Sequence, residues 1–269
     1  MKRLMKTISA WAGVVLIFAA YQPTAAGQAL SPPASINFDS LTATYHLSRD
    51  ATNRSLLTTQ EVILADFPGS GNFYGITRAI PRSYEGHSVD VKVLSVSDAA
   101  GNPIPFKTAA NKAADELVVT TGDPSITLFG PQTIKLNYQT RGVIDIKPGA
   151  NHFLLDVNGR GWDQSIGAVA ASLYLSKSVA ASLSSKPSCY IGYLSSTSAD
   201  CSVDTKSQTG QILISSKSLG ALGPHHTLVI KLDFQAATFS NKSSGHAPWY
   251  GAAGVLAVLG AIAISRRKN

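Results

Sequence analysis

The sequence lacks the motifs that hold cofactors and catalytic metals. The glycines of FPGSGNFYG (67–75) have the spacing G-x-G-x-x-x-G, which is not the dinucleotide fingerprint, and no helical pattern follows them. The only adjacent histidines, His225 and His226, would point to opposite faces of a strand, so they do not predict two ligands to one metal. We therefore expect neither a cofactor nor a metal site.

Glutamate is scarce, and no recognisable catalytic spacing of carboxylates is present. The chain has three glutamates beside 13 aspartates. A glycoside hydrolase needs two carboxyl groups that face each other across the substrate. Asp156 and Asp163, which flank VNGRGW, are the best candidates for such a pair. We expect that the protein is not an enzyme, with a hydrolase of wall material as the less favoured alternative.

Basic charge is also missing from the body of the chain. The formal net charge is +7, but six of the 23 basic residues lie in the terminal stretches 2–6 and 266–268. The other 17 basic residues nearly balance the 16 acidic ones. A balanced body gives no reason to expect a nucleic-acid partner.

The start of the chain predicts export. Residues 1–29 combine a basic beginning, an apolar run from Ile8 to Ala20 and small residues after it. The run has 13 residues, which is too short for a comfortable membrane span. This pattern is typical of a secretory signal peptide, with cleavage after Ala26 or Ala29.

The end of the chain predicts a membrane anchor. Residues 248–265 are apolar, with Trp249 and Tyr250 suited to one interface and the basic tail 266–269 suited to the cytoplasmic one. The polar stretch 240–247 (SNKSSGHA) is typical of a flexible stalk. No Leu-Pro-x-Thr-Gly sortase motif precedes the span. We therefore expect a single-pass type I protein of the cell membrane, with its ectodomain outside the cytoplasm.

The body, residues 30–239, shows the strand-and-turn pattern of an all-β domain. Runs rich in Val, Ile, Leu, Thr and Tyr alternate with clusters of Gly, Pro, Asn and Asp. LTATYHL (41–47) predicts a half-buried strand with Leu41 and Tyr45 on one face and Thr42 and Thr44 on the other. Expected strands cover 36–48, 56–66, 73–80, 88–97, 103–108, 116–121, 132–141, 152–157, 166–175, 188–193, 211–215 and 225–238.

Short strands without helices predict an antiparallel β-sandwich. About 200 residues suffice for one large sandwich or two small ones. A joint between two sandwiches would fall at RGVIDIKPGAN (141–151). Both arrangements remain open at this point.

The chain has two cysteines, Cys189 and Cys201, which are 12 positions apart. Two thiols in an exported domain usually pair, whereas a redox or metal pair would have C-x-x-C spacing or a nearby histidine. We expect a structural disulfide that staples a hairpin or loop. In the chain-entropy model such a bridge stabilises the fold by roughly 3 kcal/mol.

Two stretches together resemble a known family. FYGITRAIPR (73–82) resembles a signature carried by Gly75, Ile76, Arg78, Ile80 and Pro81. LLDVNGRGWDQSI (154–166) resembles a second signature, in which a hydrophobic strand leads to Asn158, Gly161 and Trp162. The family is the predicted membrane protein family of domain of unknown function 2207, and the resemblance covers about residues 36–220.

This resemblance implies an exported, β-rich domain tethered to a membrane, with no established activity. The cysteine pair after the second stretch is similar to that of the family. The chain departs from longer members, which resemble an ectodomain followed by further membrane helices and a glycine-rich tail. It also has Ser165 where proline is common.

The motif residues have a structural and a functional interpretation. Arg78 shares a strand face with Ile80 and needs a partner, such as Asp66 or a backbone carbonyl, unless it is an exposed anion clamp. Trp162 is either a core anchor or a platform for stacking a sugar. The structural interpretation is favoured for both residues.

Three functions follow from these observations. The favoured one is a membrane-anchored interaction module of the cell envelope, with an exposed apolar patch or an edge strand away from the stalk. The alternative is a module that binds carbohydrate or another envelope polymer through Trp162, Tyr74 or Tyr84. The hydrolase is third.

Overall fold

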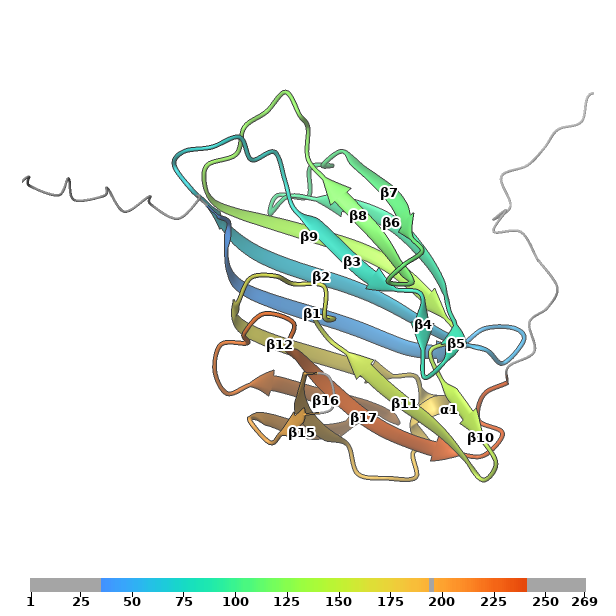
Figure 1. The fold of residues 1–269 in the computed structure, drawn as a ribbon. Coiled ribbons are helices and arrows are strands. Elements are labelled where there is room, and N and C mark those ends of the chain that lie inside the picture. Colours follow the sequence, from blue (N-terminus) through green and yellow to red (C-terminus); the bar gives the residue numbers. More distant parts are fainter. Residues whose placement is uncertain (1–34, 194–195, 241–269) are drawn as a thin grey trace, which may run out of the picture. The chain divides into compact units, whose positions relative to one another are not determined.

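The computed structural model describes residues 35–193 and 196–240 (Figure 1). Nearly all regular structure in these ranges is β-strand, and the single helix among them is α1 (Lys177–Ala180). The predicted all-β class is therefore confirmed. The predicted signal peptide (1–29), anchor (248–265) and tail (266–269), and all of the predicted stalk (240–247) except Ser240, lie outside the described residues. In the described ranges no helix is long and apolar enough to cross a membrane.

The largest element is a mixed sheet of seven strands. Its order is β15 (Cys201–Gln208), β16 (Gln211–Ser218), β12 (Ile166–Leu175), β1 (Asn37–Arg49), β2 (Ser55–Phe67), β9 (Gly130–Arg141) and β6 (Asp90–Ser97). β1 and β12 run parallel, which corrects the expectation of a wholly antiparallel arrangement. Parallel neighbours require a long crossover connection, and the long stretch of chain between β1 and β12 provides it.

One face of this sheet is buried and the other faces solvent. On β1, Leu41, Ala43, Tyr45 and Leu47 are buried, whereas Thr42 and the other residues between them point outward. This alternation is the one predicted from LTATYHL. It arises because successive side chains of a strand point to opposite faces.

Two smaller sheets and a short hairpin complete the fold. The five-stranded sheet has the order β10 (Asp145–Lys147), β11 (Ala150–Asp156), β17 (Thr227–Gln235), β13 (Ser188–Tyr193) and β14 (Ser196–Ser198). The three-stranded sheet has the order β3 (Thr77–Pro81), β8 (Glu116–Thr121) and β7 (Phe106–Asn111). β4 (Ser83–Tyr84) and β5 (His87–Ser88) form the hairpin.

The smaller sheets lie against the same side of the seven-stranded sheet (Figure 1). The Tyr45 hydroxyl of β1 donates to the carbonyl of Val157, just after β11, at 2.9 Å. Buried side chains of all three sheets join one hydrophobic cluster, in which Phe153 and Phe234 are fully buried. The stretch 141–151, considered as a joint between two sandwiches, connects strands that contribute to this one cluster.

The described chain ends beside the turn between β1 and β2. The backbone N–H of Ser240 donates to the carbonyl of Asn53 at 2.9 Å, and its hydroxyl donates to the carbonyl of Thr52 at 2.7 Å. At the other end of β2, Phe67 pairs with Gly130. A strand of 13 residues separates the two ends by about 40 Å.

Candidate functional site

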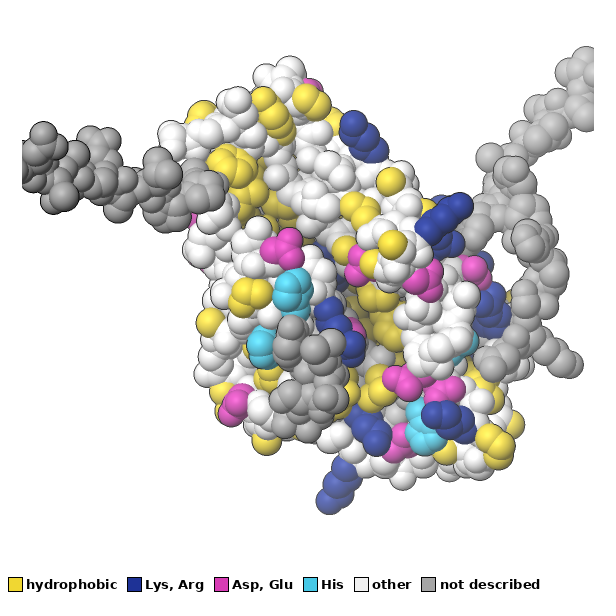
Figure 2. All heavy atoms as spheres, in the orientation of Figure 1, with side chains coloured by type: hydrophobic (Ala, Val, Ile, Leu, Met, Phe, Trp, Pro, Cys, Tyr) yellow, Lys and Arg dark blue, Asp and Glu magenta, His cyan; other side chains and the backbone are white. Residues whose placement is uncertain are grey.

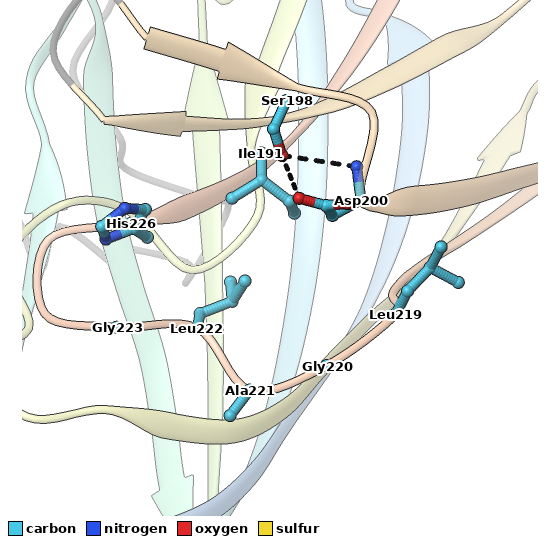
Figure 3. Close-up of a pocket in the computed structure, with 9 residues that line it drawn as sticks. All are labelled: Ile191, Ser198, Asp200, Leu219, Gly220, Ala221, Leu222, Gly223 and His226. Carbon is cyan, nitrogen blue, oxygen red and sulfur yellow. Dashed lines mark hydrogen bonds between the residues drawn. The ribbon is translucent and has the colours of Figure 1, made fainter.

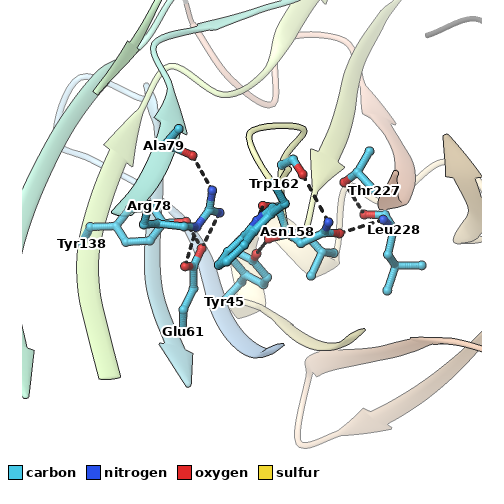
Figure 4. A network of polar contacts seen from close by, with 11 residues as sticks. Tyr45, Glu61, Arg78, Ala79, Tyr138, Asn158, Trp162, Thr227 and Leu228 are labelled. Atoms are coloured by element: carbon cyan, nitrogen blue, oxygen red, sulfur yellow. Dashed lines mark hydrogen bonds and ion pairs between the residues drawn. The ribbon is translucent and has the colours of Figure 1, made fainter. Parts of the chain in front are cut away.

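Arg78 on β3 and Glu61 on β2 form a buried ion pair between two sheets (Figure 4). The Nε and Nη2 atoms of Arg78 donate to the two carboxylate oxygens of Glu61, each at 2.8 Å. The side chains are 2% and 0% exposed. A planar guanidinium is suited to this two-point contact with a carboxylate. Arg78 therefore links the sheets from inside and does not present its charge to solvent.

Two further groups complete the hydrogen bonding of this pair. The Tyr138 hydroxyl donates to Glu61 Oε1 at 2.8 Å, and Nη1 of Arg78 donates to the carbonyl of Ala79. Burial alone would lower the pKa of Arg78, but the Glu61 carboxylate raises that pKa above its ordinary value, so the guanidinium stays charged. Burial raises the pKa of the Tyr138 phenol, which keeps it a neutral donor. The carboxylate partner is thus Glu61 rather than Asp66.

Trp162 connects the second sequence motif to this ion pair. Its ring is 4% exposed and packs edge-on against Phe38, with ring centroids 4.7 Å apart. The guanidinium carbon of Arg78 lies 5.7 Å from the centroid of the ring, within the range of a cation–π contact. The indole Nε1 donates to the carbonyl of Asn158 at 2.7 Å. A buried ring offers no surface for stacking a sugar, so Trp162 does not serve as the stacking platform of the carbohydrate hypothesis.

Asn158 ties the same loop to the strand β17. Its side-chain amide donates to the carbonyl of His226 at 2.8 Å, and its Oδ1 accepts a bond from the backbone N–H of Leu228 at 3.0 Å (Figure 4). Asn158 is fully buried. Backbone groups of a buried loop need such partners because an unpaired buried polar group is costly.

Two motif glycines permit close approaches at this junction. A side chain at Gly75 would place its Cβ 2.0 Å from the carbonyl oxygen of Thr121. A Cβ at Gly161 would lie 2.9 Å from the Cβ of Ala79, one residue after Arg78. Both positions therefore require the absence of a side chain, and Gly161 brings the loop of the second motif against the strand of the first.

The remaining motif residues fix β3 in place. Ile76 and Ile80 are buried, and the backbone N–H of Ile76 donates to the Thr121 hydroxyl at 3.0 Å. Pro81 ends β3 opposite Glu116 of β8. The structure thus brings all eight motif residues to the junction of β3 with the loop 157–162.

A pocket of about 350 Å³ opens beside this junction, and we call it the motif pocket. Its lining comprises Pro81, Ser83, Tyr84, Glu85, Ala114, Asp115, Glu116, Leu154, Asp156, Arg160 and Tyr190. Figure 2 shows this face of the molecule, where charged side chains of both signs gather around a hollow. Two tyrosines, several carboxylates and one guanidinium can together hydrogen-bond a polyhydroxylated ligand.

Asp156 is a carboxyl group of the motif pocket whose pKa is shifted by its surroundings. Burial raises its pKa above the ordinary aspartate value, while Arg160, whose Nε lies 3.7 Å from Asp156 Oδ2, acts in the opposite direction. Asp163, the other carboxylate considered for a hydrolase, is 86% exposed beside His225 and does not line the pocket. The structure therefore does not bring the two predicted carboxylates together.

A second pocket, of about 540 Å³, lies between β13, the start of β15 and the loop 219–223 (Figure 3). The Ser198 hydroxyl donates to Asp200 Oδ2 at 2.6 Å, and the backbone N–H of Asp200 donates back to Ser198 Oγ at 3.4 Å. His226 lies apart from this pair in Figure 3. The pocket therefore does not present a serine activated by a histidine.

In the described part of the chain, no group of three or more His, Cys, Asp or Glu side chains could hold a metal ion. His225 and His226 bond to different backbone carbonyls, those of Arg160 and Pro224.

The disulfide between Cys189 and Cys201 is present, as predicted, with Cα atoms 6.2 Å apart. Its position differs from the expected hairpin staple. Cys189 belongs to β13 of the five-stranded sheet, and Cys201 begins β15 of the seven-stranded sheet. The bridge therefore ties two sheets together at one side of the fold.

A mainly apolar pocket of about 250 Å³, with Asp98 and Asp123 also in its lining, lies at the end of the sheet opposite Ser240, and we call it the distal pocket. Tyr74, Ile104, Ile126 and Leu128 contribute to its lining. Ile126 is 57% exposed, and Phe129, which directly precedes β9, is 51% exposed. Large apolar side chains gathered at a surface commonly mark an interaction site.

Comparison with known families identifies the chain. Residues 39–220 match the family described as predicted membrane protein (DUF2207) N-terminal domain. The chain belongs to this family. The match covers more than half of the chain and includes both motif stretches, residues 75–81 and 158–162. None of the curated proteins compared with the chain matches it.

Several solved structures are similar to the chain at very low identity. An M1 zinc metallopeptidase from Deinococcus radiodurans is 9% identical, with a TM-score of 0.42 over 73% of this chain and 42% of that one. Native leukotriene A4 hydrolase from Saccharomyces cerevisiae is 8% identical, with a TM-score of 0.46 over 74% of this chain and 29% of that one. A putative protease from Parabacteroides distasonis is 12% identical, with a TM-score of 0.42 over 73% and 40%. The chain spans less than half of each, and these likenesses carry no conclusion about activity.

Proposed function

We propose that this DUF2207 protein is a membrane-anchored interaction module of the cell envelope, which binds another envelope protein through the distal pocket without catalysing a reaction. Family membership supports an association with the membrane. The predicted signal peptide and the predicted anchor at 248–265 give the proposed type I orientation. The observation that carries the binding role is the exposed apolar surface at the distal pocket.

The position of the distal pocket suits a tethered module. Ser240, from which the predicted stalk continues, lies beside the turn between β1 and β2. The distal pocket lies near Gly130, at the other end of β2, about 40 Å away. A module held at one end presents the opposite end to partners. Ile126 and Phe129 would supply the apolar anchors that bury most area in such a contact.

The test is site-specific photo-crosslinking in intact cells. A photoreactive residue at Phe129 is expected to trap a discrete protein adduct, whereas the same residue at Ala51, which is exposed beside Ser240, is expected to trap none. The variant Ile126→Asp should abolish the adduct without changing the unfolding temperature, because Ile126 is largely exposed. Absence of an adduct, or a crosslink only to the same chain, would refute the proposed binding role.

The second candidate function is binding of an envelope polysaccharide in the motif pocket. The observation that favours it is the lining of Tyr84 and Tyr190 together with Asp156 and Arg160. Aromatic rings beside paired polar groups are suited to sugars. Titration of the full chain with solubilised wall polysaccharide should show saturable binding that Tyr190→Ala weakens and Ile126→Asp leaves unchanged. Equal binding by both variants would exclude the motif pocket as the site.

A further inference from the structure

The outer edge of the seven-stranded sheet is open along β15. Among the described strands, β15 pairs with β16 alone, through the two-residue turn Thr209–Gly210, whose φ angles of 49° and 80° are those of a type I′ hairpin. Such a turn makes Gln208 and Gln211 a hydrogen-bonded pair. Because hydrogen-bonded and non-hydrogen-bonded pairs alternate along an antiparallel ladder, the N–H and C=O groups of Asp204 and Lys206 also point toward β16. The bond from the N–H of Leu219 to the carbonyl of Asp200, at 2.9 Å, agrees with this alternation.

The backbone groups of Val203, Thr205 and Ser207 consequently point away from the sheet. Within residues 35–193 and 196–240 no backbone bond to these outward groups is present. Thr205 and Ser207 are also exposed. A row of unpaired donors and acceptors of this kind is a template for another strand.

The side chains of the same edge carry two opposite charges on one face. Asp204 and Lys206 are both exposed, and neither has an ion-pair partner in the described part of the chain. Because strand residues alternate between faces, the two charges point to the same face of the sheet.

We propose that β15 pairs with β15 of a second copy of this chain, antiparallel and about a twofold axis at Thr205. The two seven-stranded sheets would then form one continuous sheet. Thr205 faces Thr205 of the second copy, and Val203 faces its Ser207. The partner is a second copy because the edge is complementary to itself, which is the requirement of an isologous twofold contact.

Charge selects one register for this pairing. With Thr205 on the axis, Asp204 of each copy lies opposite Lys206 of the other. These are non-hydrogen-bonded pairs, in which side chains of neighbouring strands approach most closely. A shift of two residues in one direction would place Asp204 opposite Asp204, and a shift in the other direction would place Lys206 opposite Lys206. Of these three registers, the proposed one alone avoids like charges.

The edges at β6 and β7 are less suited to such self-pairing. β6, at the opposite edge of the same sheet, has an irregularity between Val93 and Ser95, which disrupts strand pairing. β7, at the edge of the three-stranded sheet, is fully exposed, but Lys107 is its only charged residue. A single positive charge provides no attraction that would fix a register.

The test is a charge exchange in the full chain, purified in detergent, with mass measured by light scattering over a concentration series. The unaltered chain is expected to dimerise. Asp204→Lys and Lys206→Asp should each raise the dimer Kd by at least about tenfold, because each places two like-charged pairs at the contact. The double exchange Asp204→Lys with Lys206→Asp should restore dimerisation, and so should an equimolar mixture of the two single variants.

Two cysteine variants report the register. Thr205→Cys should form an intermolecular disulfide, since Cα atoms of a hydrogen-bonded pair lie about 5.5 Å apart, within the range of a disulfide. Ser207→Cys is the matched control, because its copy in the second chain would lie about 13 Å away along the strand. A chain that stays monomeric at every concentration, or a dimer insensitive to charge exchange, would overturn the proposal. Equal crosslinking by both cysteines would overturn the register. All variants alter exposed side chains, so an unchanged unfolding temperature shows that the fold is intact.

Discussion

Glu61→Gln provides the sharpest test of the role assigned to the motif junction. The change keeps the shape of the side chain and leaves an amide oxygen for the Tyr138 hydroxyl. It removes the negative charge that faces Arg78, whose side chain is 2% exposed. Removal of one partner from a buried ion pair costs about 3–5 kcal/mol, because the remaining charge cannot return to water without opening the core. For a domain of this size we expect the unfolding temperature to fall by about 10 °C.

The assay is thermal unfolding of the full chain in detergent, followed by intrinsic fluorescence. The matched control is Asp90→Asn, which removes the carboxylate from the surface pair with Arg54, whose atoms are 3.0 Å apart. Asp90 is 57% exposed, so this change should cost less than about 1 kcal/mol. Both variants replace a carboxylate by an amide, so a larger loss of stability in Glu61→Gln than in Asp90→Asn reflects the burial of the Glu61 charge rather than the loss of a charge as such.

A double-mutant cycle completes this experiment. Arg78→Met should destabilise the fold by about the same amount as Glu61→Gln, since it leaves the buried carboxylate without its cationic partner. The two changes together should cost clearly less than the sum of the single changes, because no uncompensated charge remains. If Glu61→Gln and Asp90→Asn shift the unfolding temperature equally, the ion pair does not hold the two sheets together and the reasoning fails.

Three further predictions concern other parts of the fold. Burial raises the folded-state pKa of Asp156, so the unaltered chain loses stability as pH rises from the ordinary aspartate pKa through that raised pKa. Asp156→Asn should therefore unfold at a higher temperature than the unaltered chain at neutral pH, and the difference should vanish below the ordinary aspartate pKa. A difference in unfolding temperature that stays constant across pH would contradict this prediction. Replacing Cys189 and Cys201 by serine should lower the free energy of unfolding by roughly 3 kcal/mol in denaturant titrations, and a reductant should then have no further effect. Gly122→Ala should destabilise the fold far more than Gly101→Ala. Both residues have positive φ, but only at Gly122 would the new Cβ collide with a backbone carbonyl oxygen, at 1.7 Å. Equal melting temperatures of the two variants would argue against this close approach.

Strands with apolar or β-branched runs were predictable from local sequence. The strands at 116–121, 166–175 and 188–193 have the predicted bounds, because each contrasts with polar turn residues on both sides. β15 was missed. In its sequence, CSVDTKSQ, Cys201 and Val203 are the apolar residues, and this alternation is too short to mark a half-buried strand.

The junction of the two motifs was only partly predictable. A charge on the apolar face of a strand requires a partner, and this argument applies to Arg78 from its sequence context. The same alternation in β2 places Glu61 between buried residues, which was the available signal for the partner. The alternation of buried and exposed residues along a strand indicates that a side chain is buried, but it does not indicate which other strand covers that side chain. The contact joins residues of different sheets, and their pairing depends on how those sheets pack.

The fold class, the faces of the strands, the disulfide and the family could be predicted from the sequence, because they depend on local periodicity, on the number of cysteines and on short motifs. Tertiary structure alone decided that β1 and β12 run parallel, that the disulfide joins two sheets, and that Trp162 is buried against Arg78. It also decided which surfaces remain open: the motif pocket, the distal pocket and the edge of β15. Burial and exposure are properties of packing between distant segments, and packing is not encoded in any single stretch of the chain.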